Sequence, residues 1–230
     1  MKTKALLFLL LCTAVLHAAP SDSLKPSRKF FFMINGCVNY NYRFLKTNDE
    51  QFKALVNARD SMEKPIVGYS FGFSFGKALN NKLDFLFGFR TAVEGYKTTP
   101  YQLVQNGDSV GTMYVVEHIN YFDIPIQLRY RPFSHRAYYF MAGVSPAIFT
   151  ADRFSYHIKY NDGRKVSQHG SVKGYSAINP QAIIGFGFDF PFGANMLCIQ
   201  PEFRCSVAPI VSAPIKGFLY SGGLLIGFSF

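Results

Sequence analysis

Within several apolar segments of this sequence, ionisable side chains are separated by even numbers of residues. In the segment that begins at Lys82, Asp84, Arg90 and Glu94 fall on one face of an extended strand, and phenylalanines fall on the other. The candidate set on such faces is Asp84, Arg90, Glu94, Glu117, Asp123, Arg129, Glu202 and Arg204. Carboxylates and guanidinium groups that meet inside a protein can line a gated polar path or form a paired network. We favour the paired network, which predicts a structural interior and no transport through it.

His118 is the residue best placed for catalysis, because some hydrolases that modify membrane lipids use a histidine at the membrane surface. Nucleophilic catalysis also needs a serine within hydrogen-bond reach of the imidazole and an acid that orients the ring. The local sequence, HINYFD, has no serine beside His118 on the same face. His135 falls in a short turn, and His157 and His169 fall in a surface hairpin, where solvated histidines are common. The sequence therefore predicts a protein that is not an enzyme.

No cofactor or metal site is expected. Cys37, Cys198 and Cys205 are scattered without the spacing of a zinc site or a disulfide framework. At most one pair of these thiols can form a disulfide, and the sequence does not decide whether one does. The glycine alternation in GYSFGFSFG, residues 68–76, follows a strand period and lacks the helix that a phosphate-binding loop requires.

The formal charge of +10 falls by two, to +8, when Lys2 and Lys4 are removed with an N-terminal signal. The remaining basic residues are mixed with acids and lie mostly between the apolar segments. Nucleic-acid binding requires a concentrated basic face with stacking aromatics, which this pattern lacks. We therefore expect no nucleic-acid partner, and the charge favours binding to outer-membrane lipid, through the anionic headgroups of lipopolysaccharide.

The N-terminus, residues 1–19, has the pattern of a secretory signal peptide. Two lysines precede an apolar run, residues 5–16, that is too short to span a bilayer, and alanines suited to cleavage follow it. A lipoprotein processed at Cys12 is the alternative, although the leucine before it stands where a small residue is expected. We expect a periplasmic N-terminal segment at 20–29 and one domain at 30–230. No later apolar stretch is long enough for a helical membrane span.

Eight segments alternate apolar with small or polar residues, and each is long enough to cross a hydrocarbon layer as a tilted strand. They are FFFMINGCVNYNY from Phe30, IVGYSFGFSFG from Ile66, KLDFLFGFRTAVEGY from Lys82, YVVEHINYFDIPIQLRYR from Tyr114, AYYFMAGVSPAIF from Ala137, YSAINPQAIIGFGFDF from Tyr175, MLCIQPEFRCSVA from Met196 and GFLYSGGLLIGFSF from Gly217. Their connections alternate between short turns, KALNN, PFSH and PFGAN, and longer links. Short turns on one side and long loops on the other are typical of outer-membrane barrels, whose short turns are periplasmic. The sequence therefore predicts an all-β fold, an eight-stranded antiparallel up-and-down transmembrane β-barrel with extended extracellular hairpins.

The phenylalanine-bearing faces of these strands are predicted to contact hydrocarbon. Inverting the faces would set charged side chains against lipid, at about 2–4 kcal/mol for each arginine at the midplane. Because an unpaired strand edge is costly in lipid, the last strand must pair with the first, at residues 30–42. The outward residues of this closing strand are Phe218, Tyr220, Leu224, Ile226, Phe228 and Phe230. Phe228 and Phe230 are expected in the periplasmic aromatic girdle, beside Phe75 and Tyr130.

Two hairpins are predicted in the longer links. Asn106 and Gly107 lie between YQLVQ and DSVGTMYVV, and Asp162 and Gly163 lie between SYHIKY and RKVSQ. The residues of each pair tolerate the positive φ that a type I′ turn requires. We expect two neighbouring hairpins that continue past the membrane at the cell surface. Mobile loops are the alternative.

The stretch YFDIPIQLRYRPFSHRAYYFMAGVSPAIF, residues 121–149, resembles a recurrent signature of the PorT family of outer-membrane barrels. The residues that carry the resemblance are Phe122, Asp123, Ile124, Pro125, Arg129, Tyr130, Tyr138, Gly143 and Pro146. The resemblance implies a role in the type IX secretion pathway, which exports proteases and adhesins to the surface of certain Gram-negative bacteria. Other proteins of that secretion system would then be partners. The long surface hairpins depart from the pattern and look more like those of small adhesin-type barrels.

Three functions follow from these observations. The first is a non-enzymatic outer-membrane accessory of type IX protein secretion. The second is a surface-exposed, adhesin-like binding barrel that offers the strand edges of its hairpins to a partner. The third is a lipid-modifying outer-membrane enzyme.

Overall fold

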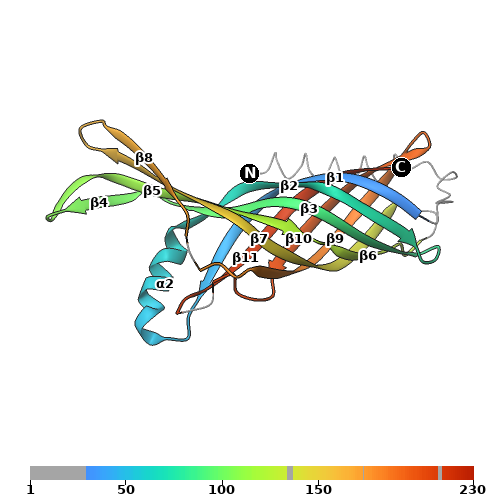
Figure 1. Cartoon of the computed structure of the whole chain (residues 1–230), viewed down its shortest axis with the longest axis horizontal. Helices are drawn as coiled ribbons and strands as arrows, with labels where there is room; N and C mark the ends of the chain where they lie inside the picture. Colours follow the sequence, from blue (N-terminus) through green and yellow to red (C-terminus); the bar gives the residue numbers. More distant parts are fainter. Residues whose placement is uncertain (1–29, 134–136, 173, 212–213) are drawn as a thin grey trace, which may run out of the picture.

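The computed structural model describes residues 30–133, 137–172, 174–211 and 214–230 (Figure 1). Its elements are β1 (Phe30–Lys46), α2 (Glu50–Met62), β2 (Glu63–Ala78), β3 (Leu83–Thr98), β4 (Tyr101–Gln105), β5 (Asp108–Asp123), β6 (Ile126–Tyr130), β7 (Tyr138–Tyr160), β8 (Lys165–Gly170), β9 (Ile178–Phe192), β10 (Asn195–Ser206) and β11 (Lys216–Ser229). The predicted signal peptide, the segment at 20–29, Cys12 and His135 lie outside the described residues. No helix in the described part of the chain is long and apolar enough to cross a membrane.

Antiparallel strands close into a ring in the order β1, β2, β3, β5 with β6, β7, β9, β10 and β11. This ring confirms the predicted eight-stranded barrel. The fourth wall strand was expected to run without a break, and the structure divides it into β5 and β6 at Ile124 and Pro125. Proline has no backbone N–H to donate to the ladder, so the pairing is interrupted there. Both pieces nevertheless pair with β3 on one side and with β7 on the other.

The last strand closes the ring by pairing with the first, as predicted. The register runs from Met33 opposite Ser229 to Lys46 opposite Lys216. At the periplasmic end, the backbone N–H of Phe230 donates to the carbonyl of Phe32 at 2.8 Å. The ring of Phe32 lies 6.4 Å from that of Phe230 and 5.3 Å from that of Phe75, measured between centroids. These aromatic rings form a group beside the C-terminus. The C-terminus lies at the end of the barrel opposite β4 and β8 (Figure 1).

The outer face of the ring is apolar. Phe71, near the middle of β2, is 63% exposed, and its neighbours of the same parity on β2 are also exposed and apolar. Of the closing-strand residues, Leu224, Ile226 and Phe230 are exposed, while Phe218, Tyr220 and Phe228 are half-buried. Tyr130 on β6 is exposed as well. Exposed apolar side chains at every second position are what a strand with one face in hydrocarbon requires.

The first long link contains a helix that the strand patterns did not reveal. Asp49 is its N-cap, and the carboxylate accepts from the backbone N–H of Gln51 at 3.0 Å. Glu50 in the first turn and Arg59 in the last turn complement the helix dipole. Only Val56 is buried among its residues, so α2 has little apolar periodicity for a sequence pattern to detect.

Replacing Phe71 by arginine should lower the free energy of unfolding by about 2–4 kcal/mol, because the guanidinium would lie near the middle of the hydrocarbon. The matched control is Val104→Arg on β4, whose side chain is similarly exposed, at 59%, but belongs to a surface hairpin. The chain has no tryptophan, so unfolding in lipid vesicles is best followed by gel mobility over a urea series. Equal tolerance of both arginines would contradict a hydrocarbon-facing surface.

Candidate functional site

The middle of the barrel interior contains a chain of buried ion pairs. Arg204 on β10 pairs with Asp123 on β5 and with Glu202, whose Oε1 lies 2.9 Å from Arg204 Nε. Arg90 on β3 donates to the same Glu202 oxygen at 3.1 Å. The side chains of Arg90, Glu202 and Arg204 are each at most 4% exposed. Unpaired charges at this depth would be strongly unfavourable, so pairing is the condition for burying them.

Two glutamines connect further predicted residues to these ion pairs. Gln181 Nε2 donates to both carboxylate oxygens of Glu94 at 3.2 Å. Gln200 accepts from Arg129 Nη2 at 3.2 Å and donates to Glu202 Oε2 at 3.0 Å. Six of the eight predicted residues are therefore brought together: Arg90, Glu94, Asp123, Arg129, Glu202 and Arg204.

The other two predicted residues lie toward opposite ends of the barrel. Asp84 pairs with Arg131, which also contacts Asp189, at the periplasmic end. Glu117, toward the extracellular end, accepts from the hydroxyls of Tyr96 and Tyr175. Sequence reasoning left Arg131, Asp189, Gln181 and Gln200 out of the set. Strand parity does place Arg131 on the inward face with Asp123 and Arg129, and Gln200 on the inward face with Glu202 and Arg204.

Apolar clusters fill the space on either side of the ion pairs. One cluster consists of buried residues that include Leu86, Tyr139 and Ile183. The other consists of Ala92, Ile119, Tyr121, Ala147, Ile210 and Leu219. A barrel of eight strands has room only for such side chains, and this interior is filled in that way. The arrangement supports a structural interior for the predicted polar residues.

The histidines form no triad in the described part of the chain. His118 is half-buried and opposes Arg153 across β5 and β7, and no serine of the described residues is hydrogen-bonded to it. His157 Nδ1 lies 3.0 Å from Ser167 Oγ, and His169 Nδ1 lies 2.9 Å from Ser155 Oγ. Each Ser–His pair bridges β7 and β8, and no carboxylate is hydrogen-bonded to either ring among the described residues. Both pairs therefore fit cross-strand hydrogen bonds of a hairpin. The described cysteines, Cys37, Cys198 and Cys205, are free thiols.

Beyond the barrel rim, β4, β5, β7 and β8 form a four-stranded surface sheet, here called the raised sheet (Figure 1). β5 and β7 pair as far as Gly111 opposite Tyr160, and β4 and β8 flank them on the two outer sides. The first tip has positive φ at Asn106 and Gly107, 53° and 91°, as a type I′ turn requires. The raised sheet is therefore an ordered continuation of the barrel wall.

The second tip differs from the expected type I′ turn. Gly163 has φ 90°, but Asp162 does not have positive φ, and the Gly163 N–H donates to the Tyr160 carbonyl at 3.0 Å. This is a type I turn followed by a left-handed glycine, the usual solution for a loop longer than two residues. The Arg164 backbone N–H and guanidinium hold the pKa of the Asp162 carboxyl below its ordinary value.

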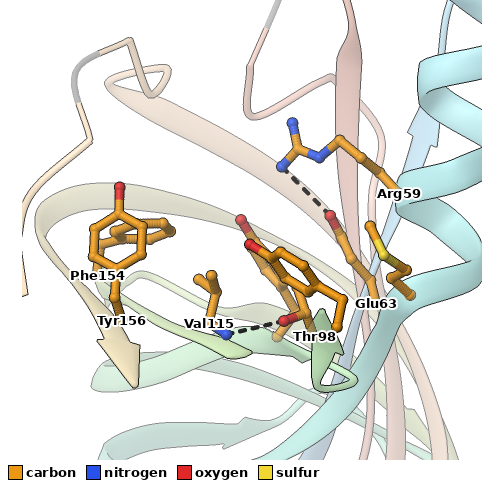
Figure 2. Close-up of a pocket in the computed structure, with 9 residues that line it drawn as sticks. Arg59, Glu63, Thr98, Val115, Phe154 and Tyr156 are labelled. Carbon is orange, nitrogen blue, oxygen red and sulfur yellow. Dashed lines mark hydrogen bonds and ion pairs between the residues drawn. The ribbon is translucent and has the colours of Figure 1, made fainter. Parts of the chain in front are cut away.

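A pocket of about 330 Å³ lies at the foot of the raised sheet, beside α2 (Figure 2). Its mostly apolar wall includes Met62, Tyr96, Tyr101, Val115, Phe154 and Tyr156. The charged part of the lining is Glu63 with Arg59, whose Nη2 lies 3.5 Å from Glu63 Oε1. Glu63 also accepts from Arg43 Nε at 3.0 Å, so its charge is already compensated. The half-exposed Arg59 guanidinium shares Glu63 with Arg43 and borders an apolar cavity, which suits an apolar group with a nearby acceptor.

Comparison with known proteins agrees with this architecture. The model of a family described as outer membrane protein beta-barrel domain matches residues 23–207. The solved structures that resemble the chain include Ail, the attachment invasion locus protein of Yersinia pestis, at 10% identity over 86% of this chain and 98% of that one, TM-score 0.36. Neisserial surface protein A matches at 13% identity over 88% and 96%, TM-score 0.39. The outer membrane protease OmpT of Escherichia coli matches at 7% identity over 92% and 99%, TM-score 0.35. No curated protein matches the chain.

Replacing Arg204 by methionine should lower the free energy of unfolding by about 3–5 kcal/mol, because Asp123 loses its ion-pair partner and Glu202 keeps only Arg90. The matched control is Arg164→Met, which breaks the solvent-exposed pair with Asp162 and should leave the free energy of unfolding nearly unchanged. Urea unfolding in lipid vesicles measures both. A neutral Arg204→Met variant would show that the interior does not depend on this pairing.

Proposed function

Because this chain belongs to the outer membrane protein beta-barrel domain family, we propose that it is a non-enzymatic barrel that binds a protein partner at the cell surface through its raised sheet. The protein resides in the outer membrane. The observation that carries the proposal is the pair of free strand edges on the raised sheet. β4 pairs only with β5 and β8 only with β7, so neither outer edge has a partner among the described residues.

A free edge presents a row of backbone N–H and C=O groups that can accept another strand. β4 has the sequence YQLVQ, without a charged residue, and Val104 on it is exposed. Tyr101, the first residue of β4, also lines the pocket at the foot of the raised sheet. A partner strand on β4 would pass beside that pocket, where one apolar side chain could serve as its anchor.

The filled interior favours binding over transport. Ion pairs and apolar clusters occupy the lumen between the periplasmic turns and the raised sheet. In a barrel with a filled interior, the groups that can bind a partner lie at the two ends. The extracellular end is the larger of the two, because it includes the raised sheet. Catalysis receives no support from the Ser–His pairs of β7 and β8, because neither has the acid that would orient the ring.

A second candidate is the accessory role in type IX protein secretion. It is supported by the resemblance to the PorT family carried by residues 121–149. In the structure, Asp123 of that stretch pairs with Arg204, and Pro125 interrupts the wall strand. Both residues therefore have a structural role in the barrel. For this reason the resemblance supports the barrel fold more strongly than it supports binding to a secretion-system protein.

Cutting back both hairpins should abolish surface binding while the barrel still folds. Residues 102–112 and 155–169 would each be replaced by an Asn-Gly turn, which leaves the pairs Tyr101–Met113 and Phe154–Gly170 to close the shortened hairpins. The measurement is retention of intact cells on host-cell layers or extracellular-matrix proteins, with heat-dependent gel mobility as the folding check. Undiminished retention of cells with a folded, truncated barrel would contradict the proposal.

Val104→Arg provides a milder test of the same idea. A charge on an exposed edge position disfavours pairing with an incoming strand, while it leaves the solvated hairpin intact. Binding should fall at least several-fold with unchanged folding. Tyr156→Arg changes a residue that lines the pocket but does not belong to the β4 edge. Comparing the two variants separates the contribution of the pocket to partner binding from that of the edge.

Deleting the gene distinguishes the two candidates. If the protein binds partners at the surface, exported proteases and adhesins should reach the cell surface in normal amounts in the deletion strain. Surface proteolysis assays and quantification of exported proteins measure this. Loss of surface delivery, restored by the hairpin-truncated protein, would favour the secretion role instead.

A further inference from the structure

We propose that the outer rim of β11, β1, β2 and β3 binds the phosphate groups of a phosphorylated glycolipid in the outer leaflet. The observation is that lysines are directly opposed in register at two places on neighbouring strands. Lys46 on β1 is directly opposite Lys216 on β11, and Lys64 on β2 is directly opposite Lys97 on β3. Here these four residues are called the lysine rim.

The lysine rim points away from the barrel interior. All four side chains are exposed. Lys46 follows Phe44 on the outward face of β1, two residues farther toward the extracellular end, and Lys64 precedes the outward Val67 of β2. The amino groups therefore lie just beyond the apolar belt, where long side chains reach from the hydrocarbon edge to lipid headgroups.

The protein itself does not neutralise these charges. Directly opposite residues of antiparallel strands have Cβ atoms about 4.5–5.5 Å apart, and like charges at that spacing destabilise the sheet. No carboxylate of the described residues forms an ion pair with any of the four lysines. Within the described part of the chain, the one hydrogen bond of these amino groups runs from Lys64 Nζ to the Ser61 carbonyl at 3.5 Å, and that carbonyl has no negative charge to neutralise the lysine.

The unpaired lysines of the rim differ from the basic residues inside the barrel. Arg43, Arg90, Arg131 and Arg204 inside the lumen have a carboxylate partner, and Arg129 donates to the amide oxygen of Gln200. Two unneutralised lysine pairs on four consecutive strands of the ring, at the level of the lipid headgroups, are suited to an anion supplied from outside. At this height the surroundings are the outer-leaflet headgroups, and a sugar phosphate offers the several acceptor oxygens that two facing ammonium groups require.

The chain contains its own control for this inference. Lys159 and Lys165 are a third directly opposed lysine pair, on β7 and β8 of the raised sheet, and both are exposed. They are opposed in register in the same way but belong to the hairpin of β7 and β8, which extends beyond the ring (Figure 1). Removing their charge relieves the same repulsion without touching a headgroup.

The test compares three double variants of the full mature protein in neutral detergent micelles: Lys46→Gln with Lys216→Gln, Lys64→Gln with Lys97→Gln, and the control Lys159→Gln with Lys165→Gln. The probes are bis-phosphorylated lipid A, dephosphorylated lipid A and phosphatidylglycerol. Bound lipid is measured by native mass spectrometry, and thermal stability by heat-dependent gel mobility, which also verifies folding.

We expect each rim variant to bind bis-phosphorylated lipid A roughly five-fold more weakly for each lysine removed, and the control to bind like the parent protein. Lipid A should raise the midpoint of thermal unfolding of the parent, and the rim variants should lose most of that shift. Without lipid the rim variants should be at least as stable as the parent, because the repulsion is gone. This lipid-free result separates lost binding from damaged folding.

Three results would overturn the proposal. One is undiminished lipid A binding by both rim variants. Another is equal binding of dephosphorylated lipid A, and the third is an equal, lysine-dependent shift with phosphatidylglycerol, which would indicate general attraction to anionic headgroups. The outcome is independent of surface binding by the raised sheet, because none of the rim lysines lies on β4 or β8.

Discussion

The constraint on which this structure depends is the absence of water in hydrocarbon. Every backbone N–H and C=O group of a membrane-spanning strand must be paired within the protein, so the sheet has to close on itself. The pairing of β1 with β11, from Met33 opposite Ser229 to Lys46 opposite Lys216, achieves that closure. The same constraint inverts the usual arrangement of side chains, because apolar residues face lipid and polar residues are left with the interior.

The inverted interior explains why the ion pairs connect strands that are not neighbours in the sheet. Arg90 on β3 and Asp123 on β5 both reach the Glu202–Arg204 pair on β10, across the lumen. Gln181 on β9 reaches Glu94 on β3 in the same way. Backbone hydrogen bonds hold each strand to its neighbours, while these side chains hold opposite walls together. Ion pairs and hydrogen bonds that join opposite walls leave little freedom for a gate to move inside the lumen. We therefore expect the functional surfaces to lie at the ends of the barrel.

Alternation in the sequence was sufficient to predict the barrel, its closure and the burial of all eight predicted polar residues, because side-chain direction has a strict period of two in a strand. It could not predict partners. Strand tilt and stagger decide which residue of β9 reaches Glu94 across the lumen. These properties are set by the closed ring as a whole. Asp162 is another example, because an Asp-Gly pair is compatible with several turns and the four-residue connection selected a type I turn. Helix α2 was missed because only Val56 of its residues is buried.

Closure removes strand edges inside the membrane, but the raised sheet creates two new ones above it. These edges are tolerated because water can satisfy their backbone groups, and both strands are short, which limits uncontrolled pairing. The two edges differ in the charge that would discourage pairing with an incoming strand. β8 carries Lys165, a charge that discourages an incoming strand, whereas β4 reads YQLVQ and carries none. Because Tyr101 of β4 also borders the apolar pocket beside Arg59, the less guarded edge is the one with an anchoring cavity next to it. An edge without a charge accepts an incoming strand more readily than a charged one, so this distribution is consistent with the proposal that β4 receives a partner.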